Sequence, residues 1–201
     1  MKKVVLLLCT VFSCQLLSAT LTGNITFVKK PPFTGVLYAN GGSGPSSAEL
    51  DQSNKVFDKK LLVVGEGGNL KFKNSDSFQH NIFANDPNTN VKFDVGLMEQ
   101  GQTKEIKADW KSGSVTRIGC KIHPKMRSYI ANVPSDKFQV FEFEKKVKEY
   151  SVKLDVGSAS TFTLSIPKYD DVVVSLSQGE SKSVDIMYKG KKKATMTLSL
   201  D

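Results

Sequence analysis

The chain has 201 residues and carries 28 Lys and Arg against 20 Asp and Glu, which gives a formal net charge of +8 at pH 7. This length allows one large domain or two small ones with enough residues for a hydrophobic core. The basic residues are not gathered in an arm of the kind that binds nucleic acid, so we expect no nucleic-acid partner. The positive charge is instead suited to steering the protein toward acidic partners.

The first segment of the chain is a predicted secretory signal peptide. Lys2 and Lys3 form a positive start, residues 4–12 are mostly apolar, and small residues follow up to Ala19. The apolar run is shorter than the about 20 residues that a membrane-spanning helix needs. We predict cleavage after Ala19, with a lipoprotein cut before Cys14 as the alternative. The mature form is therefore expected to have no membrane span and to be periplasmic or secreted.

The chain between the leader and residue 134 is predicted to consist of strands and turns. Leu70 and Phe72 alternate with lysines, as expected for a strand with one buried face. The predicted strands cover residues 23–28, 35–38, 59–64, 69–73, 115–120 and 128–133. The only candidate helices are short, at residues 50–55 and 101–110. Short strands separated by turns favour an antiparallel sandwich over a parallel sheet, which would need crossover helices.

The region after Pro134 is predicted to form a second, small β region. Its expected strands cover residues 138–144, 150–154, 161–166, 172–176, 184–188 and 194–200. It contains no His and no Cys, and we interpret the positive cluster at residues 189–193 as a solvated hairpin turn. We therefore predict an all-β chain with a leader at 1–19, a sandwich domain at 20–134 and a small β-sandwich-like region of unknown role at 135–201.

Cys120 is the only cysteine that remains once the leader is removed, because Cys9 and Cys14 lie within it. No internal disulfide can form in such a chain, and a lone thiol in an oxidising compartment needs a reason to remain reduced. Metal ligation is one such reason, and burial as an inert residue is the alternative.

Cys120 begins a segment in which ligand residues recur at every third position, with His123 and Met126 following it. A thiolate, an imidazole and a thioether on one loop suit a soft, redox-active metal. The only other histidine, His80, lies after a predicted strand and completes the donor set of a blue copper site. The sequence therefore predicts one copper ion bound by His80, Cys120, His123 and Met126. Zinc is a weaker alternative, because a thioether is an unusual zinc ligand.

Three residues beside these ligands are expected to support or surround the site. Pro124 fixes its own φ and restricts His123 before it, so it should stiffen the loop. Lys121 and Lys125 place positive charge next to His123, and we interpret them either as a docking face for a partner or as two solvated lysines.

The motif Cys-x-x-His-Pro-x-Met, with His80-Asn81 far upstream, resembles that of the cupredoxins, and its short loop is most similar to the amicyanin type. Residues 50–57 and 74–83 also resemble the plastocyanin-like proteins often described as methylamine-utilisation proteins. The resemblance covers roughly residues 21–133.

The resemblance implies a Greek-key cupredoxin sandwich in which the two His, the Cys and the Met bind copper. It also implies that the backbone N–H of Asn81 donates a hydrogen bond to the Cys120 thiolate and tunes its potential. The chain departs from the pattern at two positions: Lys125 stands where an aromatic residue is expected, and Ser128 where a glycine is usual.

These features lead us to expect an exported type 1 (blue) copper protein that carries single electrons and is not an enzyme. Its expected partners are redox proteins such as a cytochrome or a periplasmic dehydrogenase. One alternative is a periplasmic protein that stores, delivers or senses copper. Such proteins often have Met-rich tracts, whereas the methionines of this chain are widely scattered. Another is a structural or interaction module in which the copper site is incidental.

Overall fold

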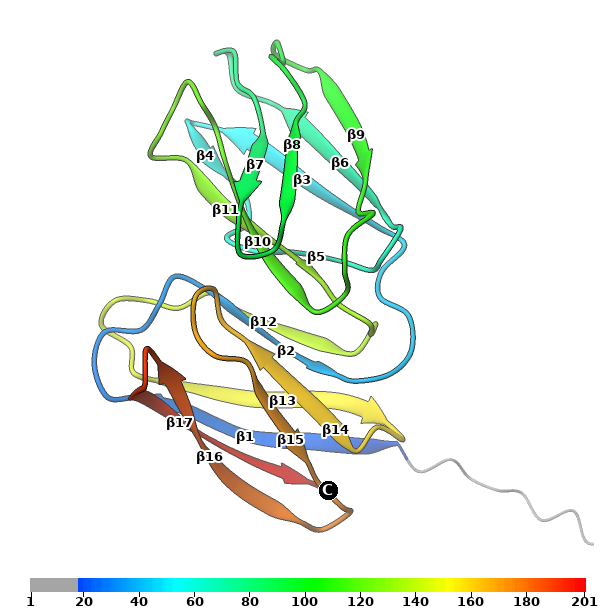
Figure 1. Cartoon of the computed structure of the whole chain (residues 1–201), viewed down its shortest axis with the longest axis vertical. Coiled ribbons are helices and arrows are strands. Elements are labelled where there is room, and N and C mark those ends of the chain that lie inside the picture. The colour runs from blue at the N-terminus through cyan, green and yellow to red at the C-terminus, as the bar shows by residue number, and fades with distance from the viewer. Residues whose placement is uncertain (1–17) are drawn as a thin grey trace, which may run out of the picture.

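The structure is a computed structural model that describes residues 18–201, and within this range every regular element is a β-strand (Figure 1). The prediction of an all-β chain is therefore confirmed. The predicted leader lies outside the described residues except for Ser18 and Ala19, and Ala19 is the first residue of β1. A search of the described residues for a helix of membrane-spanning length and hydropathy finds none.

The strands form two sandwiches, which we name by their place in the chain. The insert sandwich consists of the sheets β5-β11-β10-β7-β8 and β4-β3-β6-β9. Its strands are β3 (Ser47–Ser53), β4 (Val56–Phe57), β5 (Leu62–Val64), β6 (Asn69–Asn74), β7 (Phe83–Asp86), β8 (Val91–Asp94), β9 (Thr103–Lys107), β10 (Ser114–Gly119) and β11 (Arg127–Asn132).

The terminal sandwich consists of the sheets β13-β1-β17-β16 and β12-β2-β14-β15. Its strands are β1 (Ala19–Phe27), β2 (Gly35–Ala39), β12 (Phe138–Phe141), β13 (Glu149–Gly157), β14 (Thr161–Ser165), β15 (Val172–Ser175), β16 (Ser181–Tyr188) and β17 (Lys191–Leu200).

The first two strands correct the predicted domain boundaries. β1 pairs antiparallel with β13 and β17, and β2 pairs antiparallel with β12 and β14. Residues 19–39 therefore belong to the same sandwich as the chain after residue 134, and the insert sandwich is threaded between β2 and β12. The predicted units 20–134 and 135–201 differ from this arrangement because strand patterning identifies a strand but not a partner more than a hundred residues away.

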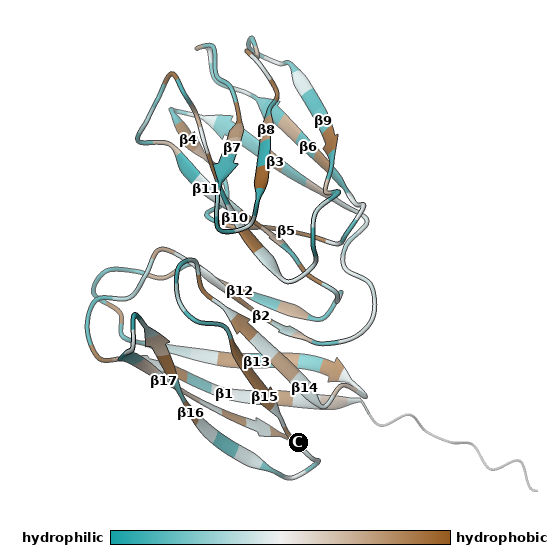
Figure 2. Cartoon of the chain, viewed as in Figure 1, coloured by the Kyte–Doolittle hydropathy of each residue, from teal (hydrophilic) through white to brown (hydrophobic). Residues whose placement is uncertain are grey.

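The four sheets stack as layers, and the inner two cover each other around β2, β5 and β11, whereas β8 and β15 of these sheets carry exposed residues (Figure 1). Every residue of β2 and of β5 is buried, whereas β17 alternates between buried and partly exposed residues. The two sandwiches meet through a shared apolar layer formed by Val36, Tyr38, Leu61, Val63, Tyr129, Ala131 and Val133. Hydrophilic and hydrophobic colours mix along outer strands such as β9 and β13, as expected for sheets with one solvated face (Figure 2).

Both candidate helices of the sequence are wrong. Residues 50–53 belong to β3, which pairs in parallel with β6, and residues 103–107 form β9. Leu50 and Gln52 are buried and Asp51 between them is not, so the local period is that of a strand. β5 and β11 form a second parallel pair, and all other strand pairs are antiparallel within the described residues.

Candidate metal centre

The predicted ligands come from two loops at one end of the insert sandwich. His80 lies between β6 and β7, and Cys120 directly follows β10. β10 pairs with β7 through Ile118 and Ala84, so the loop that starts at Cys120 and the loop that holds His80 emerge side by side. Strand pairing thus brings together residues that are 40 positions apart in the sequence.

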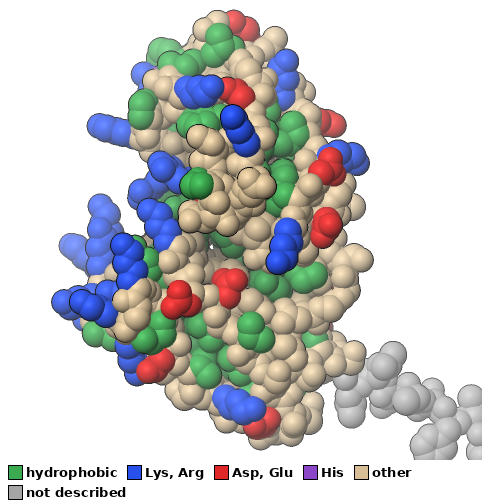
Figure 3. Space-filling view, viewed as in Figure 1, with side chains coloured by type: hydrophobic (Ala, Val, Ile, Leu, Met, Phe, Trp, Pro, Cys, Tyr) green, Lys and Arg blue, Asp and Glu red, His purple; other side chains and the backbone are tan. Residues whose placement is uncertain are grey.

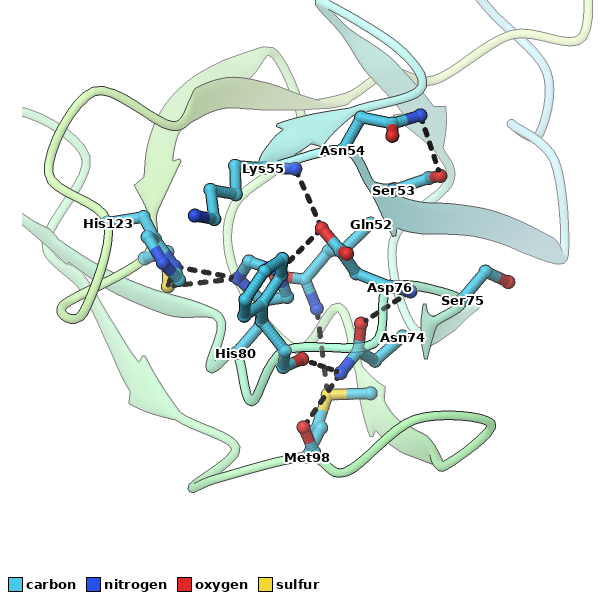
Figure 4. A network of polar contacts seen from close by, with 12 residues as sticks. Gln52, Ser53, Asn54, Lys55, Asn74, Ser75, Asp76, His80, Met98 and His123 are labelled. Carbon is cyan, nitrogen blue, oxygen red and sulfur yellow. Dashed lines mark hydrogen bonds and ion pairs between the residues drawn. The ribbon is translucent and has the colours of Figure 1, made fainter.

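Three donor atoms lie close together at this end (Figure 4). The Nδ1 atoms of His80 and His123 are 3.0 Å apart. The Sγ atom of Cys120 is 3.7 Å from Nδ1 of His80 and 3.9 Å from Nδ1 of His123.

These separations fit a single metal ion. With metal–nitrogen bonds of about 2.0 Å and metal–sulfur bonds of about 2.3 Å, donors about 120° apart on one ion lie roughly 3.7 Å from each other for nitrogen and sulfur and roughly 3.5 Å for two nitrogens. The 3.0 Å between the two Nδ1 atoms corresponds to a narrower angle of about 100° at the ion. Two imidazoles and one thiolate are the trigonal donor set of copper electron-transfer sites. The residues present therefore fit a copper ion, and Cys120, which is 2% exposed, is a free thiol shielded from solvent.

His80 is held through its backbone and through one of its two ring nitrogens. Its backbone N–H donates to the carbonyl of Met98 at 3.1 Å, and its own carbonyl accepts from Met98 N–H at 2.7 Å. Its Nε2 lies 3.1 Å from Oδ2 of Asp76. A carboxylate only accepts hydrogen bonds, so Nε2 carries the proton and Nδ1 keeps its lone pair for a metal.

Asp76 contacts the candidate site but was not predicted as a site residue. In the sequence it is only part of residues 74–83, which resemble plastocyanin-like proteins. It is 7% exposed, and its Oδ2 also accepts the backbone N–H of Lys55 at 2.7 Å (Figure 4). The Lys55 N–H and then His80 hold the pKa of Asp76 below its ordinary value, so it is a carboxylate at neutral pH. The signal that could have found it is an acidic residue four positions before a predicted histidine ligand.

Asn74 organises the loop between β6 and His80. Its side-chain oxygen accepts a hydrogen bond from the backbone N–H of Asp76 at 3.0 Å. This bond to the residue two positions later forms an Asx turn, which Asn favours. Its Nδ2 donates to the carbonyls of Phe78 and Met98, each at 2.8 Å. Asn74 is fully buried, so the loop has little freedom to move His80.

His123 lies on a tight turn that Pro124 shapes. The backbone N–H of Met126 donates to the carbonyl of His123 at 2.9 Å, and Pro124 takes the second position of this turn, where its fixed φ is favoured. Burial lowers the pKa of His123, and repulsion from His80, whenever that ring is protonated, and from Lys55 lowers it further. The imidazole is thus neutral at pH 7, which is the form that binds metals.

Met126, the fourth predicted ligand, is buried with 3% of its surface exposed. It lies at the end of the turn that carries His123, and it lines a cavity that Cys120 and Pro124 also line but His80 and His123 do not. Ser128, the unexpected residue after it, is also buried, and its hydroxyl donates to the carbonyl of Lys59 at 2.8 Å. This bond fastens β11 to the segment before β5.

Asn81 has a different set of contacts from the predicted one. Its side-chain oxygen accepts the backbone N–H of Lys121 at 2.7 Å, and its Nδ2 donates to Asp94 at 3.1 Å. A bond from its backbone N–H to the thiolate is not among the hydrogen bonds of residues 18–201. Asn81 therefore ties the start of the metal loop to the His80 loop through its side chain.

The two lysines of the loop are not equivalent. Lys121 forms an ion pair with Asp94 at 2.6 Å, and this pair holds the pKa of Asp94 below its ordinary value. Lys125 is exposed and makes no ion pair among the described residues. Two apolar side chains near the ligands are also exposed, Phe78 at 50% and Ile122 at 46%. The surface over the site is thus partly apolar, and its lysines without an ion pair among the described residues include Lys125 and Lys55, whose Nζ lies 4.1 Å from the centroid of the Phe78 ring.

No protein-family model and no curated protein sequence matches the chain. Among solved structures, a purple cupredoxin from Nitrosopumilus maritimus is similar, with 19% identity, a TM-score of 0.37, and coverage of 42% of this chain and 98% of its own. Amicyanin from Paracoccus versutus has 12% identity and a TM-score of 0.38 over 48% of this chain and 96% of its own. The Cu-containing nitrite reductase from Thermus scotoductus SA-01 has 21% identity and a TM-score of 0.37 over 43% of this chain and 21% of its own. Each similarity covers less than half of this chain, so the case for a metal rests on the donor atoms themselves.

Proposed function

We propose that the protein is an exported one-electron carrier whose type 1 copper ion is bound by His80, Cys120, His123 and Met126. The observation that carries the proposal is the triangle of two Nδ1 atoms and one Sγ atom with edges of 3.0, 3.7 and 3.9 Å. Two imidazoles with a thiolate serve both oxidation states of copper, and a weak thioether disfavours the square-planar geometry of Cu(II).

A bound copper ion would supply a centre that alternates between +1 and +2. The chain's own contribution is to hold its ligands before the metal arrives. His80 is fixed by Met98 and Asp76, and the loop of Cys120 and His123 is fixed by the turn at Pro124. Ligands that are already in place need little rearrangement when the charge of the ion changes, which favours rapid electron transfer.

The side chain of His123 is the proposed point of electron entry and exit. It is partly exposed, whereas His80 and Cys120 are buried. Exposed Ile122 and Phe78 flank it with apolar surface, which suits brief contact with a redox protein such as a cytochrome or a periplasmic dehydrogenase. Export through the leader at residues 1–19 accounts for Cys120 as the lone cysteine of the mature chain.

The test compares electron exchange with copper release. Protein loaded with Cu(II) is mixed with a reduced cytochrome, and separately with a strong copper chelator. We expect fast, reversible reduction and slow copper loss. Slow reduction together with ready copper transfer to the chelator would instead indicate storage or delivery of copper. Failure to bind copper at all would favour an interaction module.

A further inference from the structure

One end of the terminal sandwich carries a net positive charge at least as large as that of the whole described chain. Three connections meet there: residues 28–34 between β1 and β2, residues 144–149 in the turn before β13 and its first residue, and residues 188–193 at the β16–β17 hairpin. We call these 19 residues the lysine end. Its lysines are Lys29, Lys30, Lys145, Lys146, Lys148, Lys189, Lys191, Lys192 and Lys193.

Backbone hydrogen bonds bring the three connections together around the end of β1. The N–H of Phe27 donates to the carbonyl of Lys148 at 2.8 Å, and the N–H of Val28 donates to the carbonyl of Lys193 at 2.9 Å. Figure 3 shows the result as a group of Lys and Arg side chains along the left edge of the terminal sandwich.

The charge of this end exceeds that of the remaining described residues. The lysine end holds nine Lys and two Glu, a net charge of +7. Residues 18–201 as a whole carry +6, because only Lys2 and Lys3 of the charged residues precede them. The rest of the described chain is thus close to neutral. Of the nine lysines, Lys192 alone forms an ion pair there, with Asp185 at 2.6 Å.

Two exposed apolar side chains project from the same end. Val28 is 56% exposed and precedes Lys29 and Lys30, and Val147 is 39% exposed between Lys146 and Lys148. They are two of only seven large hydrophobic side chains exposed among the described residues. Apolar side chains at loop tips, surrounded by lysines, match a bilayer surface, where anionic headgroups attract the lysines and the interface accepts the apolar groups.

We propose that the lysine end binds the surface of an anionic lipid bilayer. Lysine suits this partner because its flexible ammonium group is attracted by diffuse charge without a fixed geometry. An acidic protein is the less favoured partner, because protein interfaces are enriched in Arg and aromatic residues and depleted in Lys. In Figure 1 the β10–β11 loop that holds Cys120 and His123 lies on the same side of the molecule as the lysine end. A docked protein would therefore turn its metal loop toward the membrane side.

The proposal is tested by sedimentation of the full mature chain with vesicles of phosphatidylcholine, with and without about 30% phosphatidylglycerol. We expect binding to the anionic vesicles alone, and loss of that binding at high salt. The variant Lys29→Glu, Lys30→Glu, Lys145→Glu, Lys146→Glu should bind far more weakly, because each lysine near an anionic surface contributes on the order of a fivefold change in partitioning. Val28→Ser with Val147→Ser should weaken binding severalfold without changing the charge.

A matched variant separates the surface from the net charge. Lys92, Lys104, Lys107 and Lys111 are exposed lysines of the insert sandwich, and their replacement by Glu makes the same change in total charge. This control should keep most of the vesicle binding. The proposal is overturned if both quadruple variants lose binding equally, if zwitterionic vesicles bind as well as anionic ones, or if the protein binds polyglutamate but not anionic vesicles. The last result would assign the lysine end to an acidic protein.

Discussion

The insert sandwich and the terminal sandwich have similar architecture but divide the chemistry unequally. Both histidines and the free cysteine of the described chain lie in the insert sandwich, and most of the excess positive charge lies at one end of the terminal sandwich. The insert sandwich is formed by one continuous segment of the chain. The terminal sandwich combines β1 and β2, which precede that segment, with β12 to β17, which follow it. The comparison indicates a metal-binding unit carried by a scaffold that has its own surface role.

The largest expected effect is on copper binding, and it is confined to the insert sandwich. Cys120→Ser removes the thiolate, the only charged donor in the proposed ligand set, so copper affinity should fall by several orders of magnitude. Competition titration with a copper chelator measures the loss. The fold should be kept, because Ser is close to Cys in volume. Unchanged copper affinity in a folded Cys120→Ser variant would exclude this residue as a ligand.

The second prediction breaks the chain at the junction of the two sandwiches. A chain of residues 41–134 keeps every strand of the insert sandwich and should fold and bind copper, although it exposes the shared layer at Leu61, Val63, Tyr129, Ala131 and Val133. A longer chain of residues 20–134 should aggregate more strongly. The longer chain retains β1 and β2 without their partners, and the apolar side chains of Leu21, Ile25 and Leu37 would then be exposed. Solubility, circular dichroism and the copper spectrum measure the difference. Equal behaviour of the two chains would show that β1 and β2 do not need the C-terminal strands.

The third prediction disturbs the terminal sandwich alone. Gly23 lies in β1 at a φ of 150°, and a Cβ atom there would collide with the carbonyl oxygen of Thr197 on β17. Gly23→Ala should lower the free energy of unfolding by about 3 kcal/mol, as measured by urea denaturation. Gly157→Ala is the control: its φ is 57° but no atom lies near the added Cβ, so its cost should be only about 1 kcal/mol. Copper spectra of both folded variants should match the wild type.

The fourth prediction concerns the carboxylate beside His80. In Asp76→Asn the negative charge that accepts the His80 N–H is lost, so Cu(II) is less stabilised and the reduction potential should rise. A change on the order of 1 kcal/mol corresponds to a few tens of millivolts, since about 59 mV is a tenfold change for one electron. Cyclic voltammetry measures it. Asp58→Asn, at an exposed carboxylate of the same sandwich, is the control and should shift the potential less. A lower potential in Asp76→Asn would contradict the assigned role.

The smallest expected effect is the pH dependence of the ion pair between Asp94 and Lys121. The pKa of Asp94 is held below its ordinary value, so the pair stabilises the folded state above about pH 4 and loses this effect as pH falls through the folded-state pKa. Asp94→Asn should therefore lower the metal-free protein's stability by less than about 1 kcal/mol at neutral pH, because the pair is partly exposed. Urea denaturation at neutral pH and at about pH 2 should show the difference vanish in acid. If Asp94→Asn lowered the free energy of unfolding equally at both pH values, the charge of Asp94 would not be the cause of the destabilisation.

The sequence predicted that His80, Cys120 and His123 lie together because these ligand candidates belong to rare residue types. With two His and one Cys outside the predicted leader, few combinations were available, and His80, Cys120 and His123 lie together in the structure. Asp76 was missed because it is one of 20 acidic residues, and its role depends on the loop geometry that Asn74 sets. The predicted docking lysines could not be ranked, because the pairing of Lys121 with Asp94 depends on two loops meeting.

Each predicted strand overlaps a strand of the structure, but β3, β4, β7, β8 and β9 were not predicted, and neither was the pairing. The strand predicted at residues 23–28 overlaps β1, which has one buried face. Nothing in that local pattern identifies β13 and β17 as its neighbours, because backbone hydrogen bonds are the same for any partner. The lysine end was likewise not predicted as a unit, since its first connection precedes the other two by more than a hundred residues and the three meet around the end of β1.

The most direct test of the proposed metal centre is the absorption spectrum of the full chain loaded with Cu(II). We predict one copper ion per chain and an intense thiolate-to-copper charge-transfer band in the visible region, absent from Cys120→Ser. Only the weak absorption of ordinary Cu(II) complexes, or a spectrum that Cys120→Ser leaves unchanged, would contradict a site formed by His80, Cys120 and His123.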